Sequence, residues 1–426
     1  MQQAARWAAA LMSRIGLENV HLEPWHLRSG WMRGRADVEL STPPGIPLNV
    51  TSYGWTGSTP TGGIEADVVE VSREAIADEL AGAAGWTGKV VFLTSRSSKG
   101  GNNPTFYSEF VKLVATADRV HAAAVIARDL RPGLMLTHTG PVTFGDDTAY
   151  EIPVLDISDE HQKLVERLLE DRRLVRLRLN VQNRFVPGPV QATNVSGEIR
   201  GREHPEEIVV LGAHLDSWDL GTGAIDDGTG VAALLGAAQA IRISGQRPRR
   251  TIRVVLFTGE EQGLLGSRVW VKEHAAEVPK LVCALVLDWG QGPITALPLA
   301  GHQELKKDLT PLVDFLNGIQ KFRLADGFLT FTDGYAFTLA GVPGLAFYQE
   351  SPEYSLVGHS AADTYDKVNA EALARNTATI AIAGFWIADR PNRIGATWPL
   401  EEIPRRLAEL KQKTMLETLG LWPFAK

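Results

Sequence analysis

IVVLGAHLD, residues 208–216, is an apolar run that stops at a histidine and an aspartate. Two later runs end in the same way: IRVVLFTGEE, residues 252–261, stops at two glutamates, and LVCALVLD, residues 281–288, stops at an aspartate. Runs dominated by β-branched residues and leucine are typical of parallel strands that are buried on both faces. Because open α/β sheets bind ligands beyond the carboxyl ends of such strands, we expect these polar side chains to converge on one site.

The strands alternate with amphipathic segments from about residue 183 onward. This alternation predicts a three-layer α/β/α domain around a mixed sheet. Its helices are predicted at residues 230–243, 264–274, 303–318 and 370–388, and a single last helix is predicted at residues 404–419.

A chain of 426 residues exceeds the usual size of one core, so we expect two domains. Residues 48–182 show short strands and turns without a cluster of His, Asp and Glu, which predicts a smaller, β-rich α/β insertion that covers or flanks the cleft without taking part in catalysis. Residues 1–47 then form the N-terminal part of the main domain, with a first helix that looks cut short, and residues 183–426 form the rest of it.

The net charge, the length of the apolar stretches and the cysteine count limit which binding partners we expect. The formal net charge of -7 argues against a nucleic acid or an anionic membrane surface, since neither would be attracted electrostatically. No apolar stretch is long enough for a transmembrane helix. Cys283 is the only cysteine, so an intrachain disulfide is impossible, and we expect a buried, inert thiol. A peptide or small-molecule substrate is compatible with all of these observations.

His214 and Asp216 lie two residues apart at a strand end, so their side chains face the same side. The carboxylate of Asp216 can then fix the tautomer of His214, as a metal-ligating histidine requires. A structural His–Asp pair is the ordinary alternative.

The glycine-rich segment GTGAIDDGTG, residues 221–230, contains two adjacent carboxylates, Asp226 and Asp227. Glycine is used where the backbone approaches another group closely or adopts a positive φ. One aspartate of the pair is therefore a candidate bridge between two cations. The alternative is an ordinary loop in which Asp227 or Thr229 caps the next helix.

Glu260 and Glu261 follow the second strand, and neighbouring side chains point to different places. One can ligate a metal while the other holds the attacking water, which is the division that metal-assisted hydrolysis needs. Glutamates at the start of a helix are also favoured by its dipole. Asp288 and His359 complete a set of five ligand candidates at strand ends and loops, which together predict a metal hydrolase.

Five motifs of this chain resemble those of the co-catalytic zinc exopeptidases, the family that includes bacterial aminopeptidases and carboxypeptidase Q, also known as plasma glutamate carboxypeptidase. They lie within residues 212–368, in the order GAHLDSWDLGTGAIDDGTG, LFTGEEQGLLGSRVW, VLDWG, TDGYAFTLAGVPG and GHSAADTYDKV. The segments HLDSWD and AIDDG are most similar to the motifs of the carboxypeptidase Q branch. Residues 48–182 resemble the protease-associated domain that this branch carries as an insertion.

The resemblance implies two zinc ions and a role for each motif residue. His214 and Asp288 are then the terminal ligands of one ion, Glu261 and His359 those of the other, and Asp226 bridges them. Glu260 is implied as the general base and Asp216 as the residue that orients His214. A cis peptide bond after Asp226 is also implied.

The implied reaction is hydrolysis of dipeptides or short peptides, with Trp218 and Tyr354 as walls of the substrate site because they flank the ligand motifs. An aminopeptidase of broader specificity is the first alternative, and a glutaminyl cyclase-like enzyme or another amidohydrolase is the second. A binding protein of the transferrin receptor type would have lost ligands. The resemblance also implies a secreted or periplasmic protein, although residues 1–15 show no signal peptide and a cytoplasmic location stays open, as does a homodimer.

Overall fold

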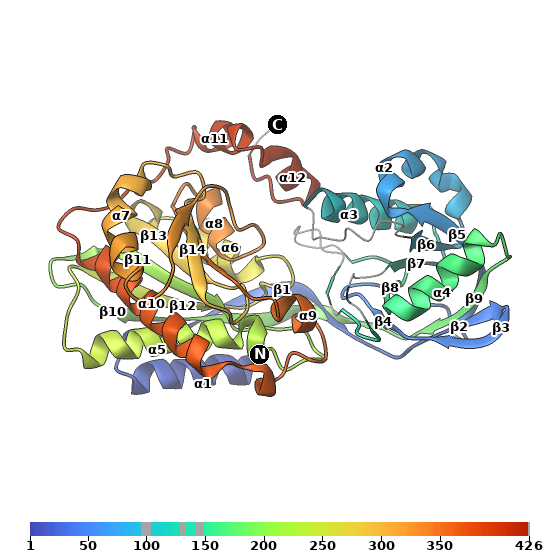
Figure 1. The fold of residues 1–426 in the computed structure, drawn as a ribbon, viewed down its shortest axis with the longest axis horizontal. Coiled ribbons are helices and arrows are strands. Elements are labelled where there is room, and N and C mark those ends of the chain that lie inside the picture. The colour runs from blue at the N-terminus through green and yellow to red at the C-terminus, as the bar shows by residue number, and fades with distance from the viewer. Residues whose placement is uncertain (95–103, 128–130, 132, 138, 141–148, 425–426) are drawn as a thin grey trace.

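The described strands form two eight-stranded sheets that lie in separate parts of the molecule (Figure 1). This computed structural model describes residues 1–94, 104–127, 131, 133–137, 139–140 and 149–424. Among the helices of the described part of the chain, we find none with the length and apolar character that crossing a membrane requires.

The first sheet has the strand order β1-β10-β12-β11-β13-β16-β14-β15. Its four inner strands β12, β11, β13 and β16 run parallel, whereas β10 and β14 pair antiparallel with them. The sheet is therefore mixed, as predicted. The strand bounds are β1 Glu18–Met32, β10 Arg184–Ile199, β11 His204–His214, β12 Arg250–Phe257, β13 Leu281–Leu287, β14 Ile294–Pro298, β15 Arg323–Ala325 and β16 Gly344–Gln349.

Helices cover both faces of this sheet, which confirms the three-layer α/β/α prediction. Side chains of α1, α5, α7 and α10 join one apolar cluster with one face of the sheet, whereas Trp270 of α6 and Phe337 of α8 pack on the other face. The helix bounds are α1 Gln2–Arg14, α5 Thr229–Ile243, α6 Leu265–Glu273, α7 Leu305–Leu316, α8 Gly334–Leu339 and α10 Ala370–Asp389.

The second sheet has the strand order β3-β2-β9-β5-β6-β7-β8-β4. Apolar clusters pack on its two faces, together with α3 and α4. The bounds are β2 Ala36–Thr42, β3 Pro44–Leu48, β4 Val50–Ser52, β5 Ile64–Ser72, β6 Val90–Thr94, β7 Ala124–Ala127, β8 Val154–Ile157, β9 Arg176–Val181, α3 Pro104–Arg119 and α4 Asp159–Glu170.

Strand pairing bears on where the insertion begins. β2 pairs with β9, so residues 36–48 belong to the second sheet and lie ahead of the boundary predicted at residue 48. The prolines near residue 45 mark the turn between β2 and β3 rather than a domain boundary. We therefore propose that the inserted domain spans residues 36–181, and we call this segment the insertion.

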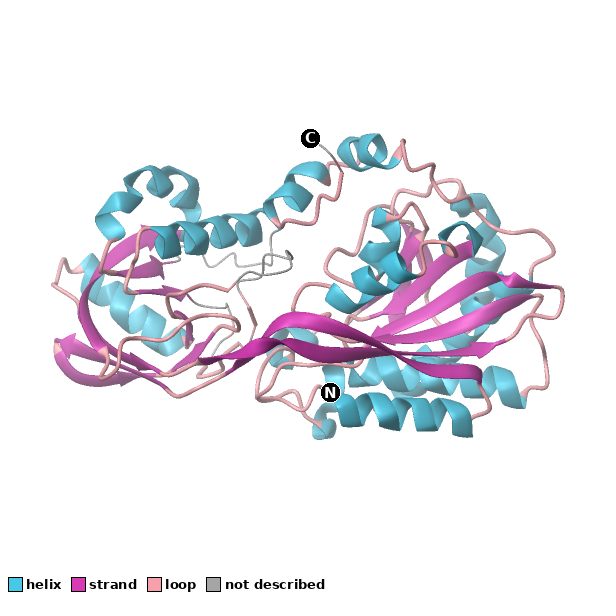
Figure 2. Cartoon of the chain, turned by 180° about the vertical axis from the view of Figure 1, so that it is seen from behind, coloured by secondary structure: helices cyan, strands magenta, loops and turns pink. Residues whose placement is uncertain are grey.

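Two connections join the insertion to the main domain. β1 and β10 form a long antiparallel ribbon that runs from the first sheet to the insertion (Figure 2). On the opposite side, α11 Ile403–Glu409 and α12 Lys413–Thr418 extend across, and α12 contacts α3 of the insertion. The ribbon and these helices bring side chains of the insertion close to the carboxyl ends of the central strands.

The single helix predicted at residues 404–419 is wrong, because the chain turns between α11 and α12 at Lys411, which has φ of 59°. The turn lets Leu407 and Leu416 pack into the same apolar cluster. The remaining short elements of the described residues are α2 Ile76–Glu79, α9 Tyr354–Val357, a 3₁₀ helix at Leu80–Trp86, a helical turn at Ala224–Gly228 before α5, and single turns at Arg73–Ala75, Val278–Lys280 and Tyr365–Lys367.

Candidate metal centre

The polar residues predicted at the strand ends lie together in the structure. His214 is the last residue of β11, Asp288 directly follows β13, and Glu261 lies four residues beyond the end of β12. Two groups of ligand atoms form, and within each group the atoms lie within 4.8 Å of one another. One group is His214, Asp226 and Asp288; the other is Asp226, Glu261 and His359.

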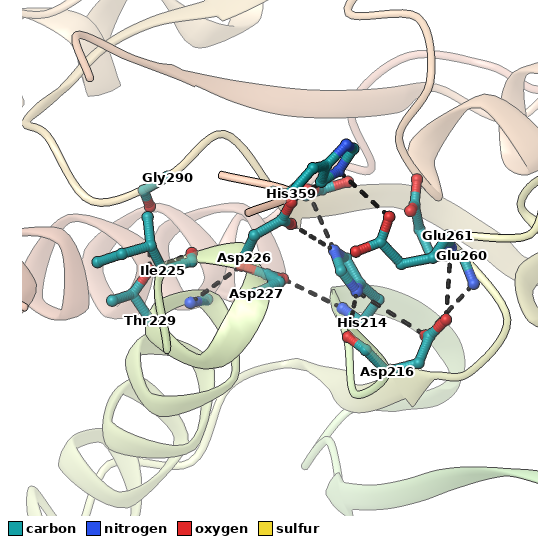
Figure 3. Close-up of polar contacts among 12 residues, drawn as sticks. His214, Asp216, Ile225, Asp226, Asp227, Thr229, Glu260, Glu261, Gly290 and His359 are labelled. Carbon is teal, nitrogen blue, oxygen red and sulfur yellow. Dashed lines mark hydrogen bonds and ion pairs between the residues drawn. The ribbon is translucent and has the colours of Figure 1, made fainter. Parts of the chain in front are cut away.

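Asp226 belongs to both groups and presents a different oxygen to each (Figure 3). Its Oδ1 lies 3.1 Å from Nε2 of His214, and its Oδ2 lies 2.9 Å from Nε2 of His359. Nε2 of His214 is also 3.4 Å from Oδ1 of Asp288, and Nε2 of His359 is 3.2 Å from Oε2 of Glu261. This is the arrangement that a carboxylate bridging two cations requires.

The donor set fits the binding of divalent metal. Oε1 of Glu261 and Oδ2 of Asp288 are buried and have no hydrogen-bond partner among the described residues. Buried polar atoms are normally paired, so unpaired carboxylate oxygens that face a cluster of ligands indicate a cation. Imidazole nitrogens together with carboxylate oxygens are ligands that zinc accepts.

Burial and mutual charge shift the pKa values of these groups. Burial raises the pKa of Glu261 to about 7 and that of Asp288 to about 6, and the charge of Asp226 adds to both shifts. Burial opposes the protonated form of His214 and of His359, but the surrounding carboxylates outweigh it and raise the pKa of each imidazole. In the metal-free protein these groups therefore retain protons, which bound cations would displace.

The two aspartates of the pair make different contacts. Asp226 faces the ligand cluster, whereas Asp227 accepts hydrogen bonds from the backbone N–H groups of His214 and Gly230, both at 3.1 Å. Asp227 thus caps the start of α5 and ties it to the end of β11. A Cβ atom at Gly230 would lie 2.1 Å from Oδ1 of Asp227, so glycine is required there. The peptide bond between Asp226 and Asp227 is cis, as the resemblance implied.

Asp216 orients His214 in a different way from the one predicted. Nδ1 of His214 donates to the backbone carbonyl of Asp216 at 3.0 Å, whereas the nearer carboxylate oxygen is 3.8 Å away. The carboxylate instead accepts from the backbone N–H groups of Glu260 and Glu261, both at 3.3 Å. The backbone carbonyl of Asp216, and not its carboxylate, therefore fixes the tautomer of His214. The carboxylate is already bonded to the N–H groups of Glu260 and Glu261, which follow β12.

Glu260 lies beside Glu261 on the same turn but outside both ligand groups (Figure 3). Burial raises the pKa of Glu260 well above its usual value, and the negative charge of Asp288 adds to this effect. Glu260 is therefore a candidate for the general base, and that role stays a prediction.

Tyr354 and Trp218, predicted as walls of the substrate site, both lie against His359. The hydroxyl of Tyr354 donates to Oδ2 of Asp226 at 2.7 Å, and its ring centroid is 6.3 Å from that of His359. Trp218 also packs edge-on against His359, with centroids 6.5 Å apart. Their role toward substrate stays a prediction.

Two buried aspartates near the centre were missed in the sequence. Asp363 accepts from the backbone N–H groups of Ile225 at 2.7 Å and Asp226 at 3.1 Å. Asp333 is fully buried, and burial, with added charge from Asp288, raises its pKa to about 8. Asp363 lies in the quoted motif GHSAADTYDKV and Asp333 in TDGYAFTLAGVPG, so their motifs were the available signal.

Two cavities lie near these residues. One of about 10 Å³, roughly the space of a single water, is lined by Trp218, Asp226, Glu261, His359 and Asp363 among others. A larger one of about 480 Å³ is lined by side chains of α1 and α5, by the segment after β11 and by His214 at the end of that strand. We assign the chemistry to the region of the small cavity, because Asp226, Glu261 and His359 line it, whereas His214 is the one ligand candidate that lines the larger cavity.

Comparison with known proteins agrees with this geometry. Residues 194–383 match the model of Peptidase family M28. The chain is 30% identical to carboxypeptidase Q of Rattus norvegicus, over 89% of this chain and 78% of the rat protein, and 29% identical to that of Mus musculus, over 89% and 79%.

Solved structures give the same fold. A peptidase M28 precursor from Shewanella amazonensis is 29% identical and superposes with a TM-score of 0.83 over 93% of this chain and 90% of the other. An aminopeptidase from an Aneurinibacillus species is 20% identical, with a TM-score of 0.68 over 93% and 90%, and shares the fold. With relatives that match along most of their length, this chain belongs to peptidase family M28.

Proposed function

We propose that this chain is a two-zinc exopeptidase that hydrolyses dipeptides or short peptides, with Glu260 as its general base. The observation that carries the proposal is the carboxylate of Asp226, whose two oxygens face His214 and His359 at 3.1 Å and 2.9 Å. Sharing of one carboxylate between two ligand groups is a requirement of a bridged pair of ions, and a single ion does not need it.

The residues fit two zinc ions. His214, Asp226 and Asp288 would hold one ion, and Asp226, Glu261 and His359 would hold the other. When bound, such a pair lowers the pKa of a water molecule and polarises the scissile carbonyl.

Glu260 performs the proton transfers of the proposed reaction. Its carboxylate takes a proton from the attacking water as the new C–O bond forms, and returns that proton to the nitrogen as the C–N bond breaks. A base works best when its pKa lies near the operating pH, and burial moves the pKa of Glu260 upward in that direction. Asp216 keeps the base in place by holding the backbone N–H groups of Glu260 and Glu261.

The names of the relatives support a substrate with a free C-terminus. Both mammalian relatives are called carboxypeptidase Q and match along most of this chain, which favours the carboxypeptidase or dipeptidase direction. Aminopeptidase action remains the alternative. Export and a homodimeric state stay predictions from the sequence.

Metal counting tests the proposal. After removal of metal by a chelator and reloading with zinc, the wild type should bind two ions per chain. His359→Ala should bind one, because only the group with His214 and Asp288 stays complete. His204→Ala is the control and should bind two, since His204 lies on the surface at the start of β11. A wild type that binds one ion or none would contradict the proposal.

A further inference from the structure

The segment after the first metal ligand faces the insertion. Trp218, four residues beyond His214, is 6% exposed and packs against two further rings. It packs edge-on against His359, at 6.5 Å between centroids and 66° between planes. It also packs edge-on against Trp55 of the insertion, at 6.4 Å and 76°. A metal ligand and the insertion thus contact the same indole ring.

Trp55 lies on a loop, residues 53–57, whose shape is fixed by several contacts. Trp31 stacks on Trp55 at 6.1 Å, and its Nε1 donates to the carbonyl of Thr56 at 2.9 Å. The hydroxyl of Thr56 donates in turn to the carbonyl of Tyr53 at 2.7 Å. A Cβ atom on Gly54 would lie 2.6 Å from Cζ3 of Trp218, so the loop backbone lies directly against that ring.

Arg33 holds Asp219, the residue that directly follows Trp218. Arg33, between β1 and the insertion, donates from Nε and Nη2 to the carboxylate of Asp219, at 3.0 Å and 2.9 Å. Its Nη1 also donates to Oγ1 of Thr51 at 3.2 Å. The side chain of Arg33 is only 7% exposed, whereas that of Asp219 is 46% exposed, so this two-point contact lies at the edge of the solvent.

A second contact reaches His359 through the backbone. Arg131 of the insertion donates from Nη1 to the carbonyl oxygen of Gly358, the residue directly before His359. His359 itself has φ of 53°, in the left-handed region that residues with a Cβ atom rarely adopt. Its backbone conformation therefore depends on what holds the loop around it.

We propose that the insertion positions the metal ligand His359, through Trp55 and Trp218 on its ring and through Arg131 on its backbone. Trp55 and Arg131 are positioning residues, because each acts through another residue. His214 and Asp288 instead lie at the ends of β11 and β13, held by the sheet itself. The insertion should accordingly control the affinity of the His359 side of the centre and leave the His214 side unchanged.

This inference rests on the proposed two-zinc centre, so the test begins with the wild type. Zinc is titrated into the metal-free full chain in competition with a chelator, which gives two dissociation constants. The constant of the His359 side is the one that Glu261→Ala abolishes. A wild type with a single constant would refute the proposed function, and this inference with it.

With two constants in hand, Trp55→Ala should weaken zinc on the His359 side by about 10- to 100-fold, the range typical of residues that support a ligand. Arg131→Met should act in the same direction, and Trp55→Phe should restore most of the affinity. Gly54→Ala keeps Trp55 but adds a methyl group that would clash with the ring of Trp218. This variant should also weaken zinc binding on the His359 side. It keeps the inference testable if Trp55→Ala fails to fold.

The controls separate positioning from general damage. Trp7→Ala removes an indole that is 54% exposed, and Arg119→Met removes a surface arginine of α3 that bonds Thr116. Both should leave the two constants unchanged. The inference is overturned if the Trp55 and Arg131 variants keep wild-type constants, or if they raise both constants equally.

Discussion

The carboxylate of Asp363 positions the backbone of Asp226. Its Oδ2 accepts a hydrogen bond from the N–H group of Asp226 at 3.1 Å, and its Oδ1 accepts one from the N–H group of Ile225 at 2.7 Å. Asp363 is 3% exposed, so both hydrogen bonds are shielded from water. The shared carboxylate of the centre is thus fixed from a loop 137 residues away along the chain.

Asp363→Asn should weaken zinc binding on both sides of the centre, because Asp226 belongs to both ligand groups. The amide replaces one accepting oxygen with an NH₂ group that faces a backbone N–H. Loss of a supporting partner of this kind typically costs about 10- to 100-fold in metal affinity. Zinc titration measures the effect, with Asp366→Asn as the control because that neighbouring acid bonds Thr364 and Lys367 on the surface. Wild-type affinity in Asp363→Asn would show that the two hydrogen bonds do not position Asp226.

Tyr354→Phe should lower zinc affinity or turnover by about 10- to 100-fold while leaving the fold intact. The hydroxyl lies 2.7 Å from Oδ2 of Asp226, and the ring, which packs against Trp289 and His359, is kept by phenylalanine. Zinc titration and steady-state kinetics on the same preparation separate the two effects. Tyr365→Phe, on a ring that is 84% exposed, is the matched control. If the two variants behaved alike, the hydroxyl of Tyr354 would have no role at the centre.

The convergence of the strand-end ligand candidates could be predicted from the sequence because their positions follow from local rules. His214 and Asp288 end buried strands, Glu261 follows another, and parallel strands bring their carboxyl ends to one edge. The alternation of strand and helix likewise predicted the layers of the main domain. Periodicity does not show where a helix turns, which is why α11 and α12 were predicted as one.

The supporting residues could not be predicted from local patterns, because each acts through a tertiary contact. The Asp363 carboxylate reaches backbone groups near Asp226, and Trp55 reaches Trp218 from another domain. Spacing in the strand correctly paired Asp216 with His214, but it could not distinguish the carbonyl of Asp216 from its carboxylate. The distinction depends on a tertiary contact, because the carboxylate of Asp216 accepts a hydrogen bond from the N–H group of Glu260.

Removal of metal should make stability depend on pH. In the metal-free protein burial raises the pKa of Glu261 to about 7, of Asp288 to about 6 and of Asp333 to about 8. A carboxyl group with a raised folded pKa binds its proton more tightly when folded, so its contribution to stability is lost as pH rises toward the folded value. The raised pKa values of His214 and His359 act in the same direction.

Thermal unfolding measures this dependence. The chelator-treated protein should have a lower melting temperature at about pH 8.5 than at about pH 6, and zinc should raise the value most at the higher pH because bound cations neutralise the carboxylates. The opposite order in the metal-free protein would mean that the buried acids are not the groups that govern its stability.

Blocked dipeptides should reveal which terminus the site recognises. Given the similarity to carboxypeptidase Q, we predict that a free dipeptide is cleaved and that C-terminal amidation abolishes cleavage. Loss of activity on N-acetylation alone would show an aminopeptidase, and loss on both would show a strict dipeptidase. Rapid cleavage of an internal bond in a long, doubly blocked peptide would contradict the exopeptidase assignment.

The most direct test of the central claim is the turnover of zinc-loaded Glu260→Gln, measured on protein whose zinc content has been counted. Glutamine keeps the size of the side chain but cannot accept the proton of the attacking water. If Glu260 is the general base beside a complete two-metal centre, the variant should hold two zinc ions per chain while kcat falls by about 10²- to 10⁴-fold. Loss of a zinc ion, or a kcat near that of the wild type, would contradict the account.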